Sequence, residues 1–345
     1  MREYILTTLF LIVCLSLPSP AQHNRESPIY LTNYIISRDA NAIGYVKLKK
    51  GEIRSVELGG EHAEAFKISR DYQLSVKQNK LNPQTKWFDV VLIVSGTAGD
   101  ITKTFRIVRD EFIHNKVIAH RGAWKNTGAP ENSIAALKHA IDLGCEGSEF
   151  DVHMSSDSLP VINHDPAIQG TSIAKTPSSR LLTLELGNAE KLPTLESYLL
   201  AGLSQNKTKL ILEIKPSELG RDASIALSGK VVSLVEKLHM EAWVDYISFD
   251  YDVCKEVITI APYAKVSYLK GDKSPAELRA DKFYGLDYHY SILEKNAGWL
   301  KESKELKLTI NVWTVNERQM LENLLKQEVD FITTNEPELL LSLVK

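Results

Sequence analysis

The chain has 345 residues, and its 41 lysines and arginines nearly balance its 44 aspartates and glutamates, for a formal net charge of −3. It is 43% hydrophobic and 25% charged, which is typical of soluble globular proteins and excludes a disordered chain, a collagen and a disulfide scaffold. The length favours two domains. The part from residue 117 onward is net acidic, which argues against nucleic acid as a partner.

The first residues have the features of an export signal. A charged start precedes an apolar run from Ile5 to Leu17, and Ser19-Pro20-Ala21 supplies small residues for a signal peptidase. The run is shorter than the roughly 20 residues that a membrane span needs, and no later segment reaches that length. We therefore expect a signal peptide over residues 1–21 and an exported protein, periplasmic or secreted. Lipid anchoring at Cys14 is the less favoured alternative.

Residues 22–114 predict a small all-β sandwich, because short segments alternate apolar and polar residues between turn signals. The expected strands are 29–31, 42–48, 54–58, 66–68, 73–76, 87–94 and 101–108. The runs 65–68, 74–76 and 88–92 resemble those of cadherin-like domains, although Leu81-Asn82-Pro83-Gln84 stands where that family has an acidic calcium motif. We expect an accessory domain with no catalytic role, whose partner the sequence does not identify.

Residues 115–345 predict an α/β fold, a TIM (β/α)₈ barrel, because apolar strands alternate with amphipathic helical segments. The expected strands are 117–119, 147–152, 161–163, 210–214, 245–249, 265–269, 283–286, 306–312 and 331–333, and clear helices are expected at 133–143, 223–238 and 318–326. No glycine-rich turn follows the first strand, which argues against an open doubly wound sheet. A barrel places its active site at the C-terminal ends of its strands.

Three carboxylates are expected at those ends. Glu149 and Asp151 are two positions apart on one strand, so both side chains point to the same face, and Glu213 ends another strand. Buried carboxylates repel each other unless a cation or a proton lies between them. Hard oxygen ligands favour one divalent cation, Mg²⁺ or Ca²⁺, and the alternative is a structural ion-pair network with nearby basic residues.

Histidines and cations follow the same strands. His120 and His164 each come directly after an apolar strand and form a candidate general acid and base pair. Arg121 and Lys215 add positive charges that bind phosphate. A metal, two cations and two histidines in one barrel mouth predict a site for an anionic phosphodiester.

Six ordered motifs make the family resemblance specific. They are His120-Arg121-Gly122, Ala129-Pro130-Glu131-Asn132-Ser133, Glu149-Phe150-Asp151-Val152 with His164-Asp165, Leu212-Glu213-Ile214-Lys215 with Ser248-Phe249-Asp250, Val312-Trp313-Thr314-Val315-Asn316, and Ile332 to Pro337. Together they resemble the signature of the glycerophosphodiester phosphodiesterases, which are related to the barrel of phosphatidylinositol phospholipase C. The resemblance implies metal-dependent hydrolysis of a small glycerophosphodiester to glycerol 3-phosphate and an alcohol.

The resemblance also implies residue roles. Glu149, Asp151 and Glu213 would bind the metal, His120 and His164 would be the catalytic acid and base, and Arg121 and Lys215 would hold the phosphate. Four further residues are candidates for the substrate pocket or for contacts behind it: Glu131, Asn132, His153 and Trp313. For Glu131 and Asn132, capping of the following helix is the alternative.

Two other functions stay open from the sequence. One is a lipid phosphodiesterase of the phospholipase D or C type on the same barrel, which would need an apolar rim around the site. The other is an inactive barrel that serves as a surface binding protein, against which the intact set of carboxylates, histidines and cations speaks.

Overall fold

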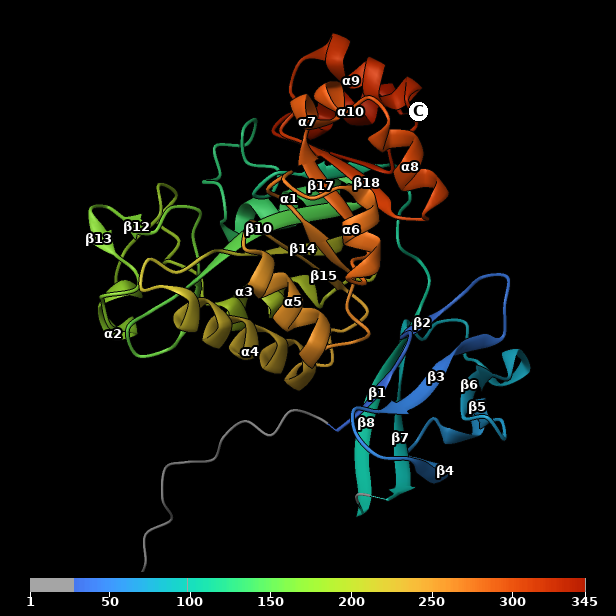
Figure 1. Ribbon diagram of the computed structural model, residues 1–345. Coiled ribbons are helices and arrows are strands. Elements are labelled where there is room, and N and C mark those ends of the chain that lie inside the picture. Colours follow the sequence, from blue (N-terminus) through green and yellow to red (C-terminus); the bar gives the residue numbers. More distant parts are fainter. Residues whose placement is uncertain (1–27, 98, 345) are drawn as a thin grey trace, which may run out of the picture.

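The computed structural model describes residues 28–97 and 99–344 (Figure 1). The expected signal peptide lies outside the described residues, so it stays a prediction. Within the described part of the chain, none of the helices combines the length and the apolar character that a membrane crossing requires.

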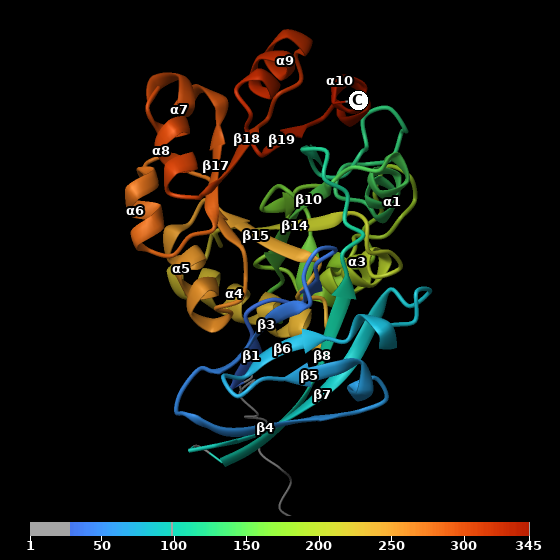
Figure 2. The ribbon, with the colours of Figure 1, turned by 90° about the vertical axis from the view of Figure 1, so that its right-hand side faces the viewer.

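The N-terminal part forms two four-stranded sheets (Figure 2). One sheet has the strand order β1-β3-β6-β5 and the other the order β2-β8-β7-β4. The strands are β1 (Ile29–Leu31), β2 (Ile35–Ile36), β3 (Ala42–Leu48), β4 (Ile53–Gly59), β5 (Phe66–Ile68), β6 (Gln73–Val76), β7 (Trp87–Gly96) and β8 (Gly99–Arg109). All seven expected strands are present. Sequence reasoning missed the two-residue β2, which pairs in parallel with β8.

The alternation of apolar and polar residues along the strands identifies the side chains that form the core of this β-rich region. Along β7 the side chains of Phe88, Val90, Leu92 and Val94 are buried, while the residues between them are partly or fully exposed. Alternate residues of a strand point to opposite faces, so one face of the β7–β8 hairpin turns inward. The inward face joins the same hydrophobic cluster as residues of the other sheet, such as Leu74.

Eight parallel strands form the closed barrel that the sequence predicts. They are β9 (Val117–Ala119), β10 (Gly147–Met154), β14 (Lys209–Ile214), β15 (Val244–Ser248), β16 (Val266–Tyr268), β17 (Gly285–His289), β18 (Thr309–Trp313) and β19 (Phe331–Thr334). Each strand pairs in parallel with the next, and β9 pairs with both β19 and β10, which closes the sheet.

Helices follow most barrel strands and cover the outside of the barrel (Figures 1 and 2). They are α1 (Ile134–Leu143), α3 (Leu195–Gly202), α4 (Arg221–Lys237), α5 (Tyr251–Ile260), α6 (Pro275–Ala280), α7 (Tyr290–Lys295), α8 (Trp299–Glu305), α9 (Arg318–Lys326) and α10 (Pro337–Leu343). Helix α1 begins one residue after the expected start, because the Ser133 hydroxyl caps it by accepting the backbone N–H of Ala136.

The strand expected at residues 161–163 is not a barrel strand. It forms as β11 (Pro160–Ile162), which pairs antiparallel with the end of β10. A small lobe follows, with β12 (Ala167–Ile168), β13 (Thr171–Ser172) and α2 (Ser178–Leu181), and it projects from the barrel in Figure 1. The lobe has its own apolar cluster of Val161, Ile168, Ile173, Leu181 and Leu192.

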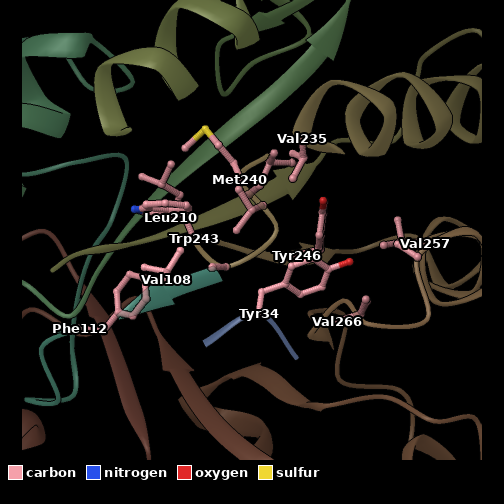
Figure 3. Close-up of a cluster of buried hydrophobic side chains, with 14 of the residues drawn as sticks. Tyr34, Val108, Phe112, Leu210, Val235, Met240, Trp243, Tyr246, Val257 and Val266 are labelled. Carbon is pink, nitrogen blue, oxygen red and sulfur yellow. The ribbon is translucent and has the colours of Figure 1, made fainter. Parts of the chain in front are cut away.

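The β-rich region and the barrel share one continuous core. Trp243, which is fully buried, meets Trp87 of β7 edge-on with 5.8 Å between ring centroids, and Phe112 at 6.4 Å. Tyr34 meets Tyr263 in the same edge-on way at 5.2 Å. Figure 3 shows the side chains of Tyr34 and Phe112 beside those of the barrel segment around Trp243. Apolar contact therefore joins the two parts.

Candidate active site

A pocket of about 120 Å³ lies at the C-terminal ends of the barrel strands. Its walls include seven residues singled out from the sequence: His120, Arg121, Glu149, His164, Glu213, Lys215 and Trp313. They come from five segments of the chain that are far apart in sequence. The barrel therefore gathers the predicted groups where this fold carries its active sites.

The three predicted carboxylates form one cluster. Glu149 and Asp151 point inward from β10, and Asp151 lies directly opposite Glu213 of β14 in the sheet register. One carboxylate oxygen from each of the three lies within 4.8 Å of the others. The three residues are 4%, 1% and 6% exposed. This is the proximity that the sequence predicts for a metal site.

The pKa values of all three carboxyl groups in this cluster are shifted. Burial and the charges of its two carboxylate neighbours raise the pKa of Glu149 well above its usual range. Burial and the Asp151 charge likewise raise the pKa of Glu213 to about 8. Burial also opposes ionisation of Asp151, but the Lys215 ammonium and the Asn132 amide outweigh it and lower the pKa of Asp151. The cluster holds more negative charge than its surroundings compensate.

A divalent cation fits this cluster. Glu149 Oε1 is buried and has no hydrogen-bond partner among the described residues, so one acceptor points into the cluster unused. Lys215 Nζ supplies a single positive charge, 2.8 Å from Glu213 Oε1 and 3.2 Å from Asp151 Oδ1. Three carboxylates offer the hard oxygen donors that Mg²⁺ and Ca²⁺ prefer. The ion-pair network that the sequence left open thus exists, but it neutralises the cluster only in part.

Asn132 positions Asp151. Its amide Nδ2 donates to Asp151 Oδ2 at 2.9 Å, and its Oδ1 accepts the backbone N–H of Asp151 at 3.1 Å. Asn132 adopts a left-handed backbone conformation, with φ of 60°, which aims the side chain into the barrel. The capping alternative for Asn132 is wrong, since Ser133 caps α1.

Glu131 acts on the site through Arg121. Both carboxylate oxygens of Glu131 lie 2.9 Å from Arg121 Nη1, and Arg121 Nε lies 3.8 Å from Asp151 Oδ2. The backbone N–H of Arg121 donates to Glu149 Oε2 at 2.8 Å. Glu131 therefore orients the guanidinium, and the capping alternative for Glu131 is wrong as well.

His120 lies at the end of β9 with its two ring nitrogens in different surroundings. Asn335 Oδ1 lies 2.8 Å from Nδ1 and, as an acceptor, places the ring proton on that nitrogen. Nε2 lies 3.9 Å from Glu149 Oε2 in the pocket. Burial and the Arg121 charge lower the pKa of His120 to about 4. His120 is thus a neutral ring with its unprotonated nitrogen toward the acidic cluster.

His164 lies at the end of β11, on the hairpin outside the barrel. Its Nδ1 lies 2.7 Å from Asp165 Oδ1, which accepts the Nδ1 proton, so Nε2 is the nitrogen left for the pocket. His153 lies behind His164, because its Nε2 contacts the His164 carbonyl oxygen at 3.0 Å. Burial lowers the pKa of His153. His153 therefore supports the loop of His164 and does not line the pocket.

The opposite wall of the pocket is aromatic. Trp313 meets Phe249 edge-on at 5.5 Å and His289 at 5.3 Å, and its indole N–H donates to the carbonyl oxygen of Asp287 at 2.7 Å. Sequence reasoning identified Trp313 but missed Phe249 and Asp287 as pocket residues. A signal was present for Phe249, which directly follows β15 within the family motif Ser248-Phe249-Asp250, but not for Asp287, which lies in the middle of β17.

Comparison with known proteins places the barrel in one family. Residues 120–339 match the glycerophosphoryl diester phosphodiesterase family. A glycerophosphodiester phosphodiesterase of Caldanaerobacter subterraneus subsp. tengcongensis is 29% identical over 246 residues, which cover 66% of this chain and 97% of that protein.

Two solved structures extend the similarity. A glycerophosphodiester phosphodiesterase from Parabacteroides distasonis is 42% identical, with a TM-score of 0.65 over 66% of this chain and 96% of the other. An Oleispira antarctica phosphodiesterase, solved with its product sn-glycerol-3-phosphate, is 28% identical, with a TM-score of 0.57 over 66% of this chain and 95% of the other. The family match includes every motif from His120 to Pro337, and the chain therefore belongs to the glycerophosphoryl diester phosphodiesterase family of phosphoric diester hydrolases.

Proposed function

We propose that the protein hydrolyses glycerophosphodiesters to glycerol 3-phosphate and an alcohol, with one divalent cation, Mg²⁺ or Ca²⁺. The observation that carries this proposal is the buried cluster of three carboxylates beside two histidines and two cations in one pocket. The bound product of the Oleispira antarctica relative supports the same product here.

Glu149, Asp151 and Glu213 would hold the cation. When bound, it supplies Lewis acidity toward a phosphoryl oxygen and compensates the negative charge of the three carboxylates. Arg121 and Lys215 contribute fixed positive charge at the pocket wall. Glu131 holds the Arg121 guanidinium, so its orientation toward a phosphate is set before the substrate binds.

The surroundings of the two histidines support different roles. His120 is neutral with a free Nε2, so it is the general base that takes the proton of the attacking hydroxyl, from water or from the glycerol 2-hydroxyl. Asp165 accepts the Nδ1 proton of His164 and leaves Nε2 for the pocket, and we assign His164 as the general acid. It donates its Nε2 proton to the oxygen that leaves phosphorus when the P–O bond to the alcohol breaks.

A diester panel with matched metal conditions tests the proposal. Purified protein should cleave small glycerophosphodiesters with Mg²⁺ or Ca²⁺, and excess chelator should abolish turnover until metal is restored. Glu149→Gln, Asp151→Asn and Glu213→Gln should each weaken metal binding in a direct titration and lower turnover. Full activity in excess chelator would overturn the metal assignment, and preference for intact phospholipids would favour the lipid phosphodiesterase.

The remaining expectations concern the N-terminal part. We propose that residues 1–21 are a signal peptide and that the mature protein is exported, with cleavage favoured over lipidation. Residues 22–114 would form a cadherin-like accessory domain, and residues 115–345 the catalytic domain. The two four-stranded sheets support the sandwich assignment.

A further inference from the structure

The catalytic pocket has two chemically different sides. One side carries the acidic cluster, the histidines and the cations described above. The other side is formed by the ends of β15 to β18 and consists of Ile247, Phe249, Leu269, Trp313 and Asp287. The proposed hydrolysis assigns no role to this second side. It is therefore available for the part of the diester that does not react.

Asp287 is a buried carboxylate without a complete set of partners. It is 2% exposed, and it points into the barrel, because its neighbour Tyr288 packs outward against Trp299 of α8. Its Oδ1 has no hydrogen-bond partner among the described residues. Burial raises the pKa of Asp287 to about 7, against a weaker opposing effect of the Asn311 side chain.

The cations that line the pocket are engaged elsewhere. Lys215 pairs with Asp151 and Glu213, and Arg121 pairs with Glu131. No ion pair involves Asp287 within residues 28–97 and 99–344. Ionisation of a buried carboxylate without a counter-ion is costly, so a cation bound beside Asp287 would stabilise its charged form.

Asp287 also borders a second cavity of about 270 Å³ at the opposite end of the barrel. The lysines of that cavity are held by other groups. Lys209 Nζ lies 3.3 Å from Asp245 Oδ1, and Lys265 Nζ lies 4.9 Å from the ring centre of Tyr284. Neither lysine pairs with Asp287, so the cation that we consider for it is one carried by a ligand in the catalytic pocket.

Aromatic rings surround the same place. The indole N–H of Trp313 donates to the backbone carbonyl oxygen of Asp287, which fixes that ring beside β17. Phe249 packs edge-on against the indole, and Lys215 Nζ lies 6.0 Å from the centre of the Phe249 ring. Aromatic faces attract cations, most strongly when the cation is shielded from water. A carboxylate among rings and aliphatic side chains suits a cation that is covered with methyl groups and needs few hydrogen-bond acceptors.

We propose that this side of the pocket binds the alcohol portion of the diester and selects an alcohol that carries a quaternary ammonium group, with Asp287 as the specificity-determining residue. The inference rests on the proposed phosphodiesterase function and adds the class of its substrate.

The test compares two diesters of nearly identical shape, glycerophosphocholine and its neutral analogue glycerophospho-3,3-dimethylbutanol. The wild-type kcat/KM should favour the charged diester by about tenfold or more. Asp287→Asn should bring the ratio close to one while kcat/KM for the neutral diester stays near the wild-type value. Asp245→Asn removes a carboxylate from the opposite cavity and should leave the ratio unchanged, with circular dichroism confirming that both variants fold.

A wild-type ratio near one, or the same ratio in the Asp287→Asn variant, would overturn the inference. Equal loss on both diesters would also overturn it, since it would show that Asp287 contacts glycerol or only stabilises the barrel. Calorimetric binding of free choline and of 3,3-dimethylbutanol separates this inference from the proposed function. Choline binding that needs Asp287, without turnover of either diester, would uphold the charge selection and refute the hydrolysis. If wild type turns over neither diester and binds choline no better than the neutral alcohol, both proposals fail.

Discussion

Two asparagine side chains position neighbouring groups of the candidate active site. Asn132 holds Asp151 through two hydrogen bonds, and Asn335 fixes the ring proton of His120 on Nδ1. Neither amide carries charge, so each acts by holding its neighbour in one orientation through hydrogen bonds. A histidine whose tautomer is fixed can serve as base from the first encounter with substrate.

At this scale the sharpest prediction concerns the two histidines. His120→Ala and His164→Ala should each lower kcat by about 10²–10⁴, the usual contribution of general acid–base catalysis. A nitrophenyl diester should partly restore the His164→Ala variant, because nitrophenolate leaves without a proton. It should not restore His120→Ala, which lacks the base. Equal rescue of both variants, measured as kcat on natural and nitrophenyl diesters, would refute the division of roles.

The roles at residue scale were only partly predictable. The carboxylates, His120 and His164 stand at strand ends in recognisable motifs, so the sequence locates them. Asn335 lies 215 positions from the histidine that it orients, and only closure of the barrel by β19 and β9 brings the two together. Asp287 sits in an ordinary strand sequence, and its lack of a partner is a property of the folded environment.

At the scale of elements, the turn from β9 to α1 shapes the site. Arg121 and Gly122 both have positive φ angles, 57° and 78°. A Cβ atom at Gly122 would lie 2.7 Å from the carbonyl carbon of Ala136 in α1, so only glycine allows this close approach. The turn aims the Arg121 N–H at Glu149 and leads on to Glu131 and Asn132.

Gly122→Ala should therefore damage both stability and catalysis. We expect a loss of about 1–3 kcal/mol in the free energy of unfolding, from strain at the left-handed position and displacement of α1. The kcat should fall as well, because Arg121 and Glu149 move with the turn. Urea unfolding with parallel kinetics measures both, and Gly128→Ala is the control, since its φ is also positive but no atom lies within 4 Å of the added Cβ. Equal effects of the two substitutions would show that backbone strain, and not the contact with α1, dominates.

The sequence predicts well where the strands lie, and less well which strands pair with each other in the sheet. Periodicity located all eight barrel strands, because each is a short apolar run between turns or helices. It also suggested β11 as one more strand of the alternation. Three residues carry no information about whether their partner runs parallel or antiparallel, and the tight turn after β10 decides that.

At the scale of the whole molecule, the contact between the β-rich region and the barrel contains a buried charge. The Glu241 side chain has no exposed surface, and neither of its carboxylate oxygens has a hydrogen-bond partner in the described chain. Lys103 of β8 approaches it at 3.9 Å and also lies 3.5 Å from Glu236. Burial raises the pKa of Glu241 to about 8, although the Lys103 charge opposes this shift.

Stability should therefore fall with rising pH through a defined window. The folded chain retains the Glu241 proton up to about pH 8, whereas the unfolded chain releases it near 4.5, the usual pKa of a glutamate. Since the folded state binds the proton more tightly, this group lowers the free energy of unfolding as pH rises between these two values. Glu241→Gln should remove this loss, so the variant gains stability relative to wild type as pH rises from 4.5 to about 8.

Urea unfolding at several pH values measures the difference. Glu305→Gln is the control, because the Glu305 side chain is 65% exposed on α8 and its substitution should leave the pH profile of wild type unchanged. Profiles for wild type and Glu241→Gln that stay parallel across the window would show that Glu241 is ionised in the folded protein.

The lobe that follows the β10–β11 hairpin links activity to local opening of the chain. His164 precedes a lobe with a separate apolar cluster, and its carbonyl oxygen contacts His153 Nε2 of β10 at 3.0 Å, whereas His120 and the acidic cluster lie in the barrel itself. Small cooperative units open at lower free energy than the domain as a whole. Transient opening of the lobe would then loosen the segment that carries His164, the proposed proton donor, while the three carboxylates stay assembled in the barrel. The enzyme would have a reversible resting form with its carboxylate cluster intact, and changes within the lobe would set how often that form occurs without altering the barrel.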